Sequence, residues 1–451
     1  MGRLFGTDGV RGEFGRDLTV DLARDLGRAA VPVLRRHERE RLRFVIGRDT
    51  RASGEALESA LAEGITGAGG VVVLAGVVPT PAVAFLTTGL KAGAGIVISA
   101  SHNPPEDNGI KFFGPYGFKL SDEIEDEIEA ELARDGGQAG GGRVLGLPAD
   151  APDYLDHLVG AAEARLDGMT VVVDCANGAA SAFAPEALRR LGAEVHPIHD
   201  APDGSNINVG CGALHPEVVA DAVRSTGADA GVAHDGDADR ALFADADGNV
   251  IDGDQVLAAS AIAMKASGTL PGDQVVSTVM ANLGFRRAME EHGIRVIEAP
   301  VGDRYVLEQM LEHGAVLGGE QSGHLIFREH ATTGDGLLTA VRFLSLAARR
   351  GVTVAEAAAV MRRFPQVLVN VRVERREGLE EAVEVWNAVR AVEAELDGSG
   401  RVLVRASGTE PLVRVMVEAE SQELARRYAK ALASIVHRVL GGPGAPEGPG
   451  G

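Results

Sequence analysis

The stretch Ala230-Gly231-Val232-Ala233-His234-Asp235-Gly236-Asp237-Ala238-Asp239-Arg240 joins a short apolar run to a cluster of carboxylates. An apolar run that stops abruptly in glycine and polar residues is typical of a buried strand followed by a functional loop. The chain repeats this pattern, each time with an alanine- and leucine-rich helical stretch nearby, at 43–46, 95–98, 171–173 and 275–279. The alternation predicts parallel sheets covered on both faces, with functional loops at the carboxyl ends of the strands.

The last part of the chain follows a different pattern. Residues 367–373 alternate between apolar and polar, and 401–417 are rich in strand-forming residues. Helical patterns occupy 379–396 and 423–440. This order predicts a small α+β domain with a half-exposed antiparallel sheet.

Length and charge narrow the class of protein. The 451 residues exceed the usual size of one hydrophobic core, so we expect roughly three domains, with two to four all compatible with the length. A net charge of -21 argues against broad electrostatic binding to nucleic acid or to an anionic membrane, and no apolar run is long enough to span a bilayer. With only two cysteines, Cys175 and Cys211, a disulfide framework is excluded and a cytoplasmic location is expected.

The carboxylates of Asp235, Asp237 and Asp239 occupy every second position of a loop, so they can converge on one hard divalent cation. Oxygen ligands alone favour Mg²⁺ or Mn²⁺ over zinc. An EF-hand counted from Asp235 would need glycine and glutamate where the chain has Arg240 and Ala246, so that interpretation fails. A solvated acidic turn is the remaining alternative.

A serine loop follows the run at 95–98, in the order Ser99-Ala100-Ser101-His102-Asn103-Pro104. A hydrolase nucleophile elbow would need glycine two residues before and after Ser101, and those positions hold Ser99 and Asn103. An esterase is therefore disfavoured. Taken alone, this loop indicates either an unusual nucleophile or ordinary turn chemistry.

Phosphate binding is indicated near the carboxyl end. Small residues between two arginines, in Arg405-Ala406-Ser407-Gly408-Thr409-Glu410-Pro411-Leu412-Val413-Arg414, can form a nest of backbone amides for an anion. An exposed Gly-Thr turn is the alternative. Lys111 is a further candidate, because the chain uses arginine for nearly all its positive charge and a retained lysine can lose a proton.

Five segments, in this order, closely resemble the alpha-D-phosphohexomutase superfamily. They are Phe5-Gly6-Thr7-Asp8-Gly9-Val10-Arg11-Gly12, Ser99-Ala100-Ser101-His102-Asn103-Pro104, Asp235-Gly236-Asp237-Ala238-Asp239-Arg240, Gly319-Glu320-Gln321-Ser322-Gly323-His324 and Arg405-Ala406-Ser407-Gly408-Thr409-Glu410-Pro411. Within the superfamily the chain is most similar to the bacterial phosphoglucosamine mutases, through segments 203–208, 301–305, 319–324 and 332–336. Cys211-Gly212-Ala213-Leu214-His215 departs from the Cys-Gly-Ser-Thr-His of that group.

The resemblance implies a fold of three similar doubly wound α/β domains followed by a smaller α+β domain, arranged around a central cleft. We expect domain bounds of 1–150, 151–252, 253–365 and 366–441, and a disordered tail at 442–451. The expected reaction interconverts glucosamine 6-phosphate and glucosamine 1-phosphate through a phosphoserine and a 1,6-bisphosphate.

The resemblance also implies roles for individual residues. The expected catalytic residues are Ser101, His102, Lys111, Arg11 and Arg240. One Mg²⁺ per chain is expected on phosphorylated Ser101, Asp235, Asp237 and Asp239, with glucosamine 1,6-bisphosphate as the activator. The expected sugar-binding residues are Thr7, Gly302, Asp303, Glu320, Ser322 and His324. The expected phosphate-binding residues are Arg405, Ser407, Gly408, Thr409 and Arg414.

Three other functions are compatible with the same residues. The same chemistry on glucose or mannose phosphate differs only in what the sugar loop accepts. A sugar-phosphate phosphatase would pass the phosphoryl group from Ser101 to water, and a binding module would have no chemistry at all. We expect a small sugar phosphate as the partner, no nucleic acid or membrane, and a homodimer as the assembly.

Overall fold

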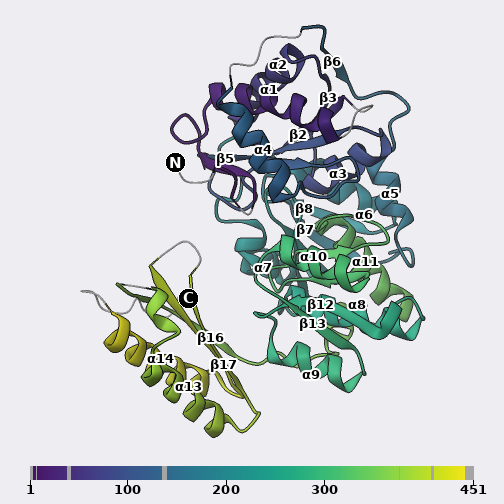
Figure 1. Cartoon of the computed structure of the whole chain (residues 1–451). Coiled ribbons are helices and arrows are strands. Elements are labelled where there is room, and N and C mark those ends of the chain that lie inside the picture. Colours follow the sequence, from purple (N-terminus) through teal and green to yellow (C-terminus); the bar gives the residue numbers. More distant parts are fainter. Residues whose placement is uncertain are drawn as a thin grey trace. The chain divides into compact units, whose positions relative to one another are not determined.

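The computed structural model describes residues 4–6, 8–37, 42–134, 140–374, 376–407 and 411–441 (Figure 1). These residues divide into two compact units. The larger unit consists of Met1–Met280 and His292–Val360, and the smaller unit of Ala281–Glu291 and Met361–Gly451. The expected tail at 442–451 lies outside the described residues.

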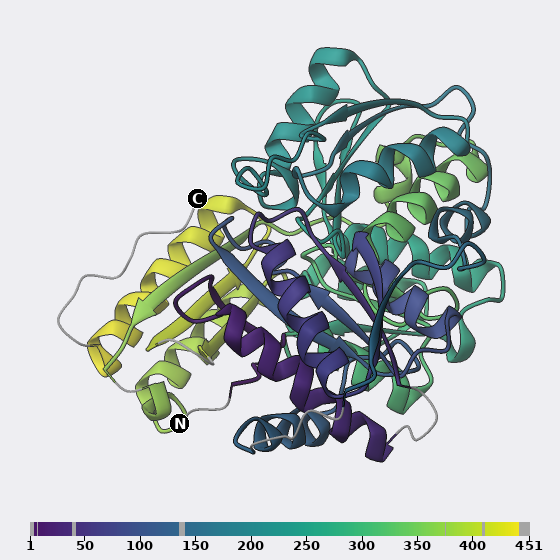
Figure 2. The ribbon, with the colours of Figure 1, turned by 90° about the horizontal axis from the view of Figure 1, so that it is seen from above.

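The first sheet of the larger unit has the strand order β1-β5-β4-β2-β3-β6. Its strands are β1 (Val10–Glu13), β2 (Arg43–Arg48), β3 (Val71–Val77), β4 (Ala94–Ile98), β5 (Asp107–Phe113) and β6 (Arg143–Gly146). Its helices are α1 (Val20–His37), α2 (Gly54–Gly67), α3 (Thr80–Gly89) and α4 (Asp122–Leu132). Helices α1 and α2 lie side by side (Figure 2). Phe44 and Ile46 of β2 pack into their core, and Val45 between them is also fully buried, so both faces of the sheet are covered.

The second and third sheets repeat this plan. The second, in the order β11-β10-β9-β7-β8, contains β7 (Thr170–Asp174), β8 (Glu194–Ile198), β9 (Ala230–His234), β10 (Ala241–Asp245) and β11 (Val250–Ile251), with α5 (Tyr154–Gly160), α6 (Ala184–Arg190) and α7 (Pro216–Thr226). The third, in the order β13-β12-β14-β15, contains β12 (Gln274–Thr278), β13 (Arg295–Ala299), β14 (Leu317–Gly319) and β15 (Leu325–Phe327), with α8 (Gly253–Ala266), α10 (Asp303–His313), α11 (Gly336–Arg350) and α12 (Val354–Ala358).

The three sheets are mixed, which corrects the expectation of parallel sheets. The pairs β4–β5, β9–β10 and β14–β15 are antiparallel. A uniformly apolar run shows that a strand is buried but not which way its neighbour runs. The connections between these pairs contain no helix, and parallel neighbours would need a long crossover.

The smaller unit has the predicted α+β architecture. Its sheet, in the order β16-β18-β17, is antiparallel throughout and contains β16 (Gln366–Arg372), β17 (Arg401–Ala406) and β18 (Leu412–Glu418). Helices α13 (Val383–Leu396) and α14 (Gln422–Leu440) pack on its apolar face. Three α/β sheets and a small α+β unit confirm the expected fold class, whereas the exact domain bounds stay a prediction.

Helix α9 (Leu283–Glu291) belongs to the smaller unit although the chain before and after it belongs to the larger one. The side-chain amide of Asn282 donates from Nδ2 to the Phe364 carbonyl oxygen at 3.0 Å, and the backbone amide of Leu283 donates to Glu418 Oε2 at 3.1 Å. Phe285 and Met289 of this helix are fully buried. The smaller unit is therefore built from two separate pieces of the chain.

No helix in the described part of the chain is both long enough and apolar enough to cross a membrane.

The buried carboxyl group of Asp335 makes the stability of the fold depend on pH. It caps α11 by accepting from the Leu338 amide at 2.9 Å, and it accepts from the Tyr154 hydroxyl at 2.7 Å. Burial, partly offset by these hydrogen bonds, raises its pKa from 3.8 to about 6. The folded state thus binds this proton more tightly than the unfolded chain, so stability falls as the pH rises from about 4 to about 6.

We expect Asp335→Asn to raise the melting temperature by a few degrees at pH 7, corresponding to about 1–3 kcal/mol, and by much less at pH 4.5. Calorimetry at the two pH values checks this. A larger gain at the lower pH would contradict the assignment of a buried charge to Asp335.

Candidate active site

Three loops at equivalent places in the three sheets bring several of the predicted residues of the larger unit together. The serine loop joins β4 to β5, the carboxylate loop joins β9 to β10, and the sugar loop, residues 320–324, joins β14 to β15. Each loop therefore connects an antiparallel pair that lies beside parallel strands. Repetition of one plan in three sheets explains how residues more than 200 positions apart line one cavity.

The serine and carboxylate loops are in direct contact. The Ser101 hydroxyl donates to Asp235 Oδ2 at 2.7 Å. A Cβ added at Gly236 would lie 2.6 Å from the Ser101 carbonyl oxygen, so only glycine lets the two backbones approach this closely. Ser101 and Ala238 both have positive φ, of 50° and 60°. Strained residues of this kind gather where a structure must aim a functional group.

The three aspartates form a site that fits a divalent cation. Each offers an oxygen within 4.8 Å of the others, and all three side chains are buried. Burial and the neighbouring carboxylates Asp239 and Asp237 raise the pKa of Asp235 well above its usual value. Among the described residues, Asp237 Oδ1 and Asp239 Oδ1 have no hydrogen-bond partner. Buried carboxylate oxygens without a partner need a cation to offset their charge.

The predicted catalytic cations and imidazole lie beside this site. His102 Nδ1 is 3.2 Å from the Ser101 hydroxyl oxygen, and burial together with Arg240 lowers the pKa of His102 to about 4, so the ring is neutral at pH 7. Arg240 Nε is 3.9 Å from both Asp235 and Asp239. Its charge therefore offsets part of the negative charge of the carboxylate loop.

Lys111 is fixed by a carboxylate that the sequence analysis did not assign. Asp8 Oδ1 lies 3.4 Å from the ammonium groups of both Lys111 and Lys119, and Asp8 Oδ2 accepts from Arg11 at 2.9 Å. Burial opposes the charge on Lys111, but Asp8 and other carboxylates outweigh it and raise the pKa of Lys111 above its usual value. Lys111 is therefore an ammonium at neutral pH, suited to donating a proton or offsetting charge.

The sugar loop meets the start of α10 across a cavity of about 200 Å³. Its lining includes Asp8, Ser101, Asp239, Arg240, Gly302, Asp303, Arg304, Tyr305, Glu320 and His324. Glu320 accepts from the Gly302 amide at 3.1 Å, and burial raises the pKa of Glu320. The Ser322 hydroxyl is buried in the same loop, without a partner among the described residues.

His324 joins the sugar loop to the carboxylate loop. Its Nδ1 lies 3.4 Å from Asp239 Oδ2, and its Nε2 accepts from the Gly334 amide at 3.2 Å. Burial favours the neutral ring, yet Asp239 and other carboxylates raise the pKa of His324 to about 9. The hydrogen bond from the Gly334 amide forms only with an unprotonated Nε2, whereas a protonated ring would pair with Asp239 through Nδ1 and lose that bond.

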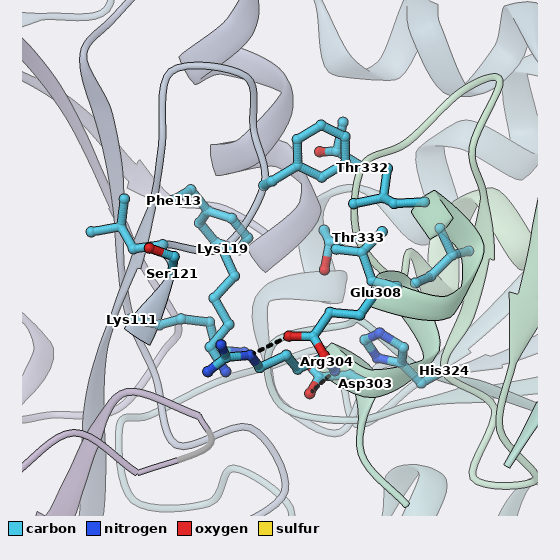
Figure 3. Close-up of a pocket in the computed structure, with 15 residues that line it drawn as sticks. Lys111, Phe113, Lys119, Ser121, Asp303, Arg304, Glu308, His324, Thr332 and Thr333 are labelled. Carbon is cyan, nitrogen blue, oxygen red and sulfur yellow. Dashed lines mark hydrogen bonds and ion pairs between the residues drawn. The ribbon is translucent and has the colours of Figure 1, made fainter. Parts of the chain in front are cut away.

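A second cavity, also of about 200 Å³, adjoins the first and shares Asp303, Arg304 and His324 with it. Figure 3 shows Lys111 and Lys119 on one side of this cavity, facing Arg304 and Asp303 on the other. Glu308 pairs with Arg304 at 2.8 Å. Charged side chains of both signs therefore line the two cavities.

The predicted phosphate-binding residues belong to the smaller unit. Arg405 of β17 lies directly opposite Arg414 of β18, and the Ser407 amide donates to the Leu412 carbonyl oxygen at 2.8 Å. Burial, and then the charge of Arg414, lowers the pKa of Arg405. Two cross-strand arginines repel each other unless an anion lies near both. Gly408 and Thr409 lie outside the described residues, as does Thr7 of the larger unit.

Asp8, Lys119 and Thr80 are site residues that the sequence analysis did not assign. Asp8 belongs to one of the segments that carry the resemblance, and Lys119 is one of the few lysines in the chain. The sequence could therefore have marked both as candidate site residues. Thr80 begins α3, and its hydroxyl donates to Asp237 Oδ2 at 2.6 Å. Nothing in the sequence pairs Thr80 with a residue 157 positions later.

The chain matches all four domains that define one family of sugar-phosphate enzymes. Residues 2–138, 152–248 and 252–364 match phosphoglucomutase/phosphomannomutase alpha/beta/alpha domains I, II and III, and residues 368–435 match the C-terminal domain. The chain therefore belongs to the phosphoglucomutase/phosphomannomutase family, which confirms the resemblance. It is 52% identical to the phosphoglucosamine mutase of Symbiobacterium thermophilum, over 98% of this chain and 100% of that protein. It is 55% identical to the phosphoglucosamine mutase of Thermobifida fusca, over 98% and 99%.

Solved structures share the fold. A phosphoglucomutase/phosphomannomutase family protein from Burkholderia thailandensis is 28% identical, with a TM-score of 0.81 over 98% of both chains. The N-acetylphosphoglucosamine mutase of Aspergillus fumigatus, solved in complex with GlcNAc-6P and magnesium, is 18% identical, with a TM-score of 0.69 over 97% of this chain and 96% of that one.

Proposed function

We propose that this protein is a phosphoglucosamine mutase, which interconverts glucosamine 6-phosphate and glucosamine 1-phosphate through a phosphorylated Ser101. The observation that carries the proposal is the hydroxyl of Ser101, which lies 2.7 Å from Asp235, one of three clustered buried carboxylates, and lines a charged cavity. Relatives 52% and 55% identical over nearly their whole length, both phosphoglucosamine mutases, support the choice of sugar.

The reaction consists of two phosphoryl transfers. In the first, the bond between phosphorus and Ser101 Oγ breaks and a bond from phosphorus to the sugar 1-oxygen forms, while the 1-hydroxyl loses its proton and Ser101 Oγ gains one. The resulting 1,6-bisphosphate reorients. In the second, the bond between phosphorus and the 6-oxygen breaks and a bond to Ser101 Oγ forms, while the Ser101 hydroxyl loses its proton and the 6-oxygen gains one. Such transfers have little covalent chemistry for the protein to perform, so positioning and charge do most of the work.

Asp235, Asp237 and Asp239 would hold Mg²⁺, one ion per chain, together with the phosphate on Ser101. When bound, the ion offsets the negative charge that accumulates on the transferring phosphoryl group. The oxygen-only donor set fits this ion, as do the Oδ1 atoms of Asp237 and Asp239, which accept no hydrogen bond from the described residues.

Other charged and polar side chains of the two units would supply the remaining functions. Lys111, as an ammonium, donates a proton to the departing sugar oxygen or offsets its charge. His102 is neutral and close to Ser101 Oγ, so it can accept a proton there. Glu320 and Ser322 bind sugar hydroxyls. Arg405 and Arg414, with Ser407, Gly408 and Thr409, hold the phosphate that is not reacting.

Substrate preference tests the proposal. We expect kcat/KM with glucosamine 6-phosphate to exceed that with glucose 6-phosphate and mannose 6-phosphate by tenfold or more, about 1.4 kcal/mol of transition-state discrimination. The assay contains Mg²⁺ and is run with and without a trace of glucosamine 1,6-bisphosphate. If turnover requires the bisphosphate, the bisphosphate is the activator. A preference for glucose or mannose phosphate would assign another sugar to the same chemistry. Steady release of inorganic phosphate would identify a phosphatase instead.

A further inference from the structure

Two buried side chains behind Ser101, Asp49 and Arg51, have no role in the chemistry above. They lie just beyond the end of β2, the strand beside β4. Arg51 Nε donates to Asp49 Oδ2 at 2.9 Å, and the side chains of both residues are 0% exposed. A buried ion pair costs stability unless the remaining donors and acceptors are also used. The groups that pair with the remaining donors of Arg51 and the remaining acceptors of Asp49 therefore indicate the role of this ion pair.

All five N–H donors of the Arg51 side chain meet an acceptor. Asp49 takes one of them. The other four donate to main-chain carbonyl oxygens of a single segment, those of Ser101 at 3.0 Å, Asn103 at 2.8 Å, Asp107 at 2.9 Å and Pro104. That segment is the loop that presents Ser101. One fully buried guanidinium thus fixes the path of the whole loop.

Asp49 reaches the same loop by a second route. Its Oδ2 accepts from the Ser99 hydroxyl at 2.6 Å, and the Ser99 hydroxyl oxygen accepts from the Ser101 amide at 2.9 Å. Arg51 therefore holds the carbonyl of Ser101, while Asp49 holds its amide through Ser99. Both main-chain groups of the residue with a φ of 50° are fixed from behind.

We propose that Asp49, Arg51 and Ser99 are positioning residues that hold Ser101 Oγ in the orientation needed to give and receive the phosphoryl group. This inference rests on the proposed function, in which Ser101 carries that group. A left-handed backbone is strained in a residue other than glycine, so the loop would relax without these contacts. A shift of about 1 Å at a reacting atom can cost roughly 10²-fold in rate.

Lysine cannot replace Arg51 in this role. An ammonium has three donors on one atom, whereas the guanidinium spreads five donors over a rigid plane that reaches carbonyls along the whole loop. Arg51→Lys keeps the charge and the ion pair with Asp49 but loses contacts to the loop. The substitution thus separates charge from positioning.

We expect Arg51→Lys to lower kcat by about 30- to 100-fold while KM changes by less than threefold. Hydrogen exchange of the amides at 99–107 should become faster, with other segments unchanged. Arg48→Lys is the matched control, because Arg48 is the last residue of β2, close to Arg51 in the chain, and pairs instead with Glu55 and Glu58 of α2. We expect its kcat to stay within twofold of the original protein.

Ser99→Ala gives a second, milder variant if Arg51→Lys does not fold, with an expected loss of about tenfold in kcat and little change in KM. Original values of kcat in a folded Arg51→Lys protein, or in Ser99→Ala, would overturn the inference. So would equal losses in kcat and substrate affinity with faster exchange throughout the chain. The rate ratios use whichever hexose phosphate the original protein converts, and an active Ser101→Ala protein would refute the proposed function separately.

Discussion

Ser101→Ala is expected to lower kcat for glucosamine 6-phosphate by on the order of 10⁴-fold or more, because it removes the oxygen that carries the phosphoryl group. Substrate affinity should remain measurable, since the cavity-lining carboxylates and cations are unchanged. Steady-state kinetics and calorimetric titration of glucosamine 6-phosphate measure the two quantities. Mass spectrometry of the original protein should find one added phosphate on the peptide that contains Ser101, and none in the variant.

Ser225→Ala is a suitable control for this substitution, because Ser225 is exposed on α7 and its hydroxyl donates to the Ala222 carbonyl oxygen. Its kcat should equal that of the original protein. A Ser101→Ala protein that retains a tenth or more of the original kcat would eliminate the covalent mechanism and leave direct transfer between sugars.

Asp237→Asn is expected to weaken Mg²⁺ binding by at least tenfold and to lower kcat by on the order of 10²–10³-fold. The substitution keeps the shape of the side chain and an acceptor for the Thr80 hydroxyl, but it removes a charge from the triad. Isothermal titration with Mg²⁺, or paramagnetic resonance with Mn²⁺, measures binding independently of activity. Chelation of the original protein should abolish turnover, and added Mg²⁺ should restore it.

Asp247→Asn is the matched control, because Asp247 is exposed in the turn that follows β10. Unchanged affinity for Mg²⁺ is expected there. If Asp237→Asn instead bound the ion as tightly as the original protein, the three carboxylates would not form the metal site.

Two of the chemistry-bearing loops could be predicted from the sequence because each one follows an apolar run. Ser101 and Asp235 stand where such a run ends, and parallel strands bring such ends together. Glu320 was assigned through the resemblance. The sequence analysis did not predict that β5, β10 and β15 run antiparallel to β4, β9 and β14, because the burial of a strand does not indicate the direction of its neighbour. The structure brings Ser101 and Asp235 into contact, whereas the assignment of their roles rests on the proposed function.

The residues behind the loops could not be predicted in the same way. Asp49 and Arg51 also follow an apolar run, so the sequence marked them as candidates for a functional loop. However, the residues of the serine loop that they contact are about 50 positions later in the chain. Only the register of β2 against β4 places them there. Lys111 was singled out by composition, yet its charge state depends on Asp8, which no spacing rule connects to it.

The smaller unit is built from two separate segments of the chain, and this limits how the protein can be shortened. A chain cut before Met361 would retain α9 but lose Phe364 and Glu418, to which Asn282 and Leu283 are bound. The buried Asn282 side chain would then lose its acceptors on Phe364 and Glu418, and a buried polar group that loses its partners costs stability. A gene fragment that begins at residue 361 would lack the same helix. Separate production of the smaller part therefore requires that α9 be supplied to it.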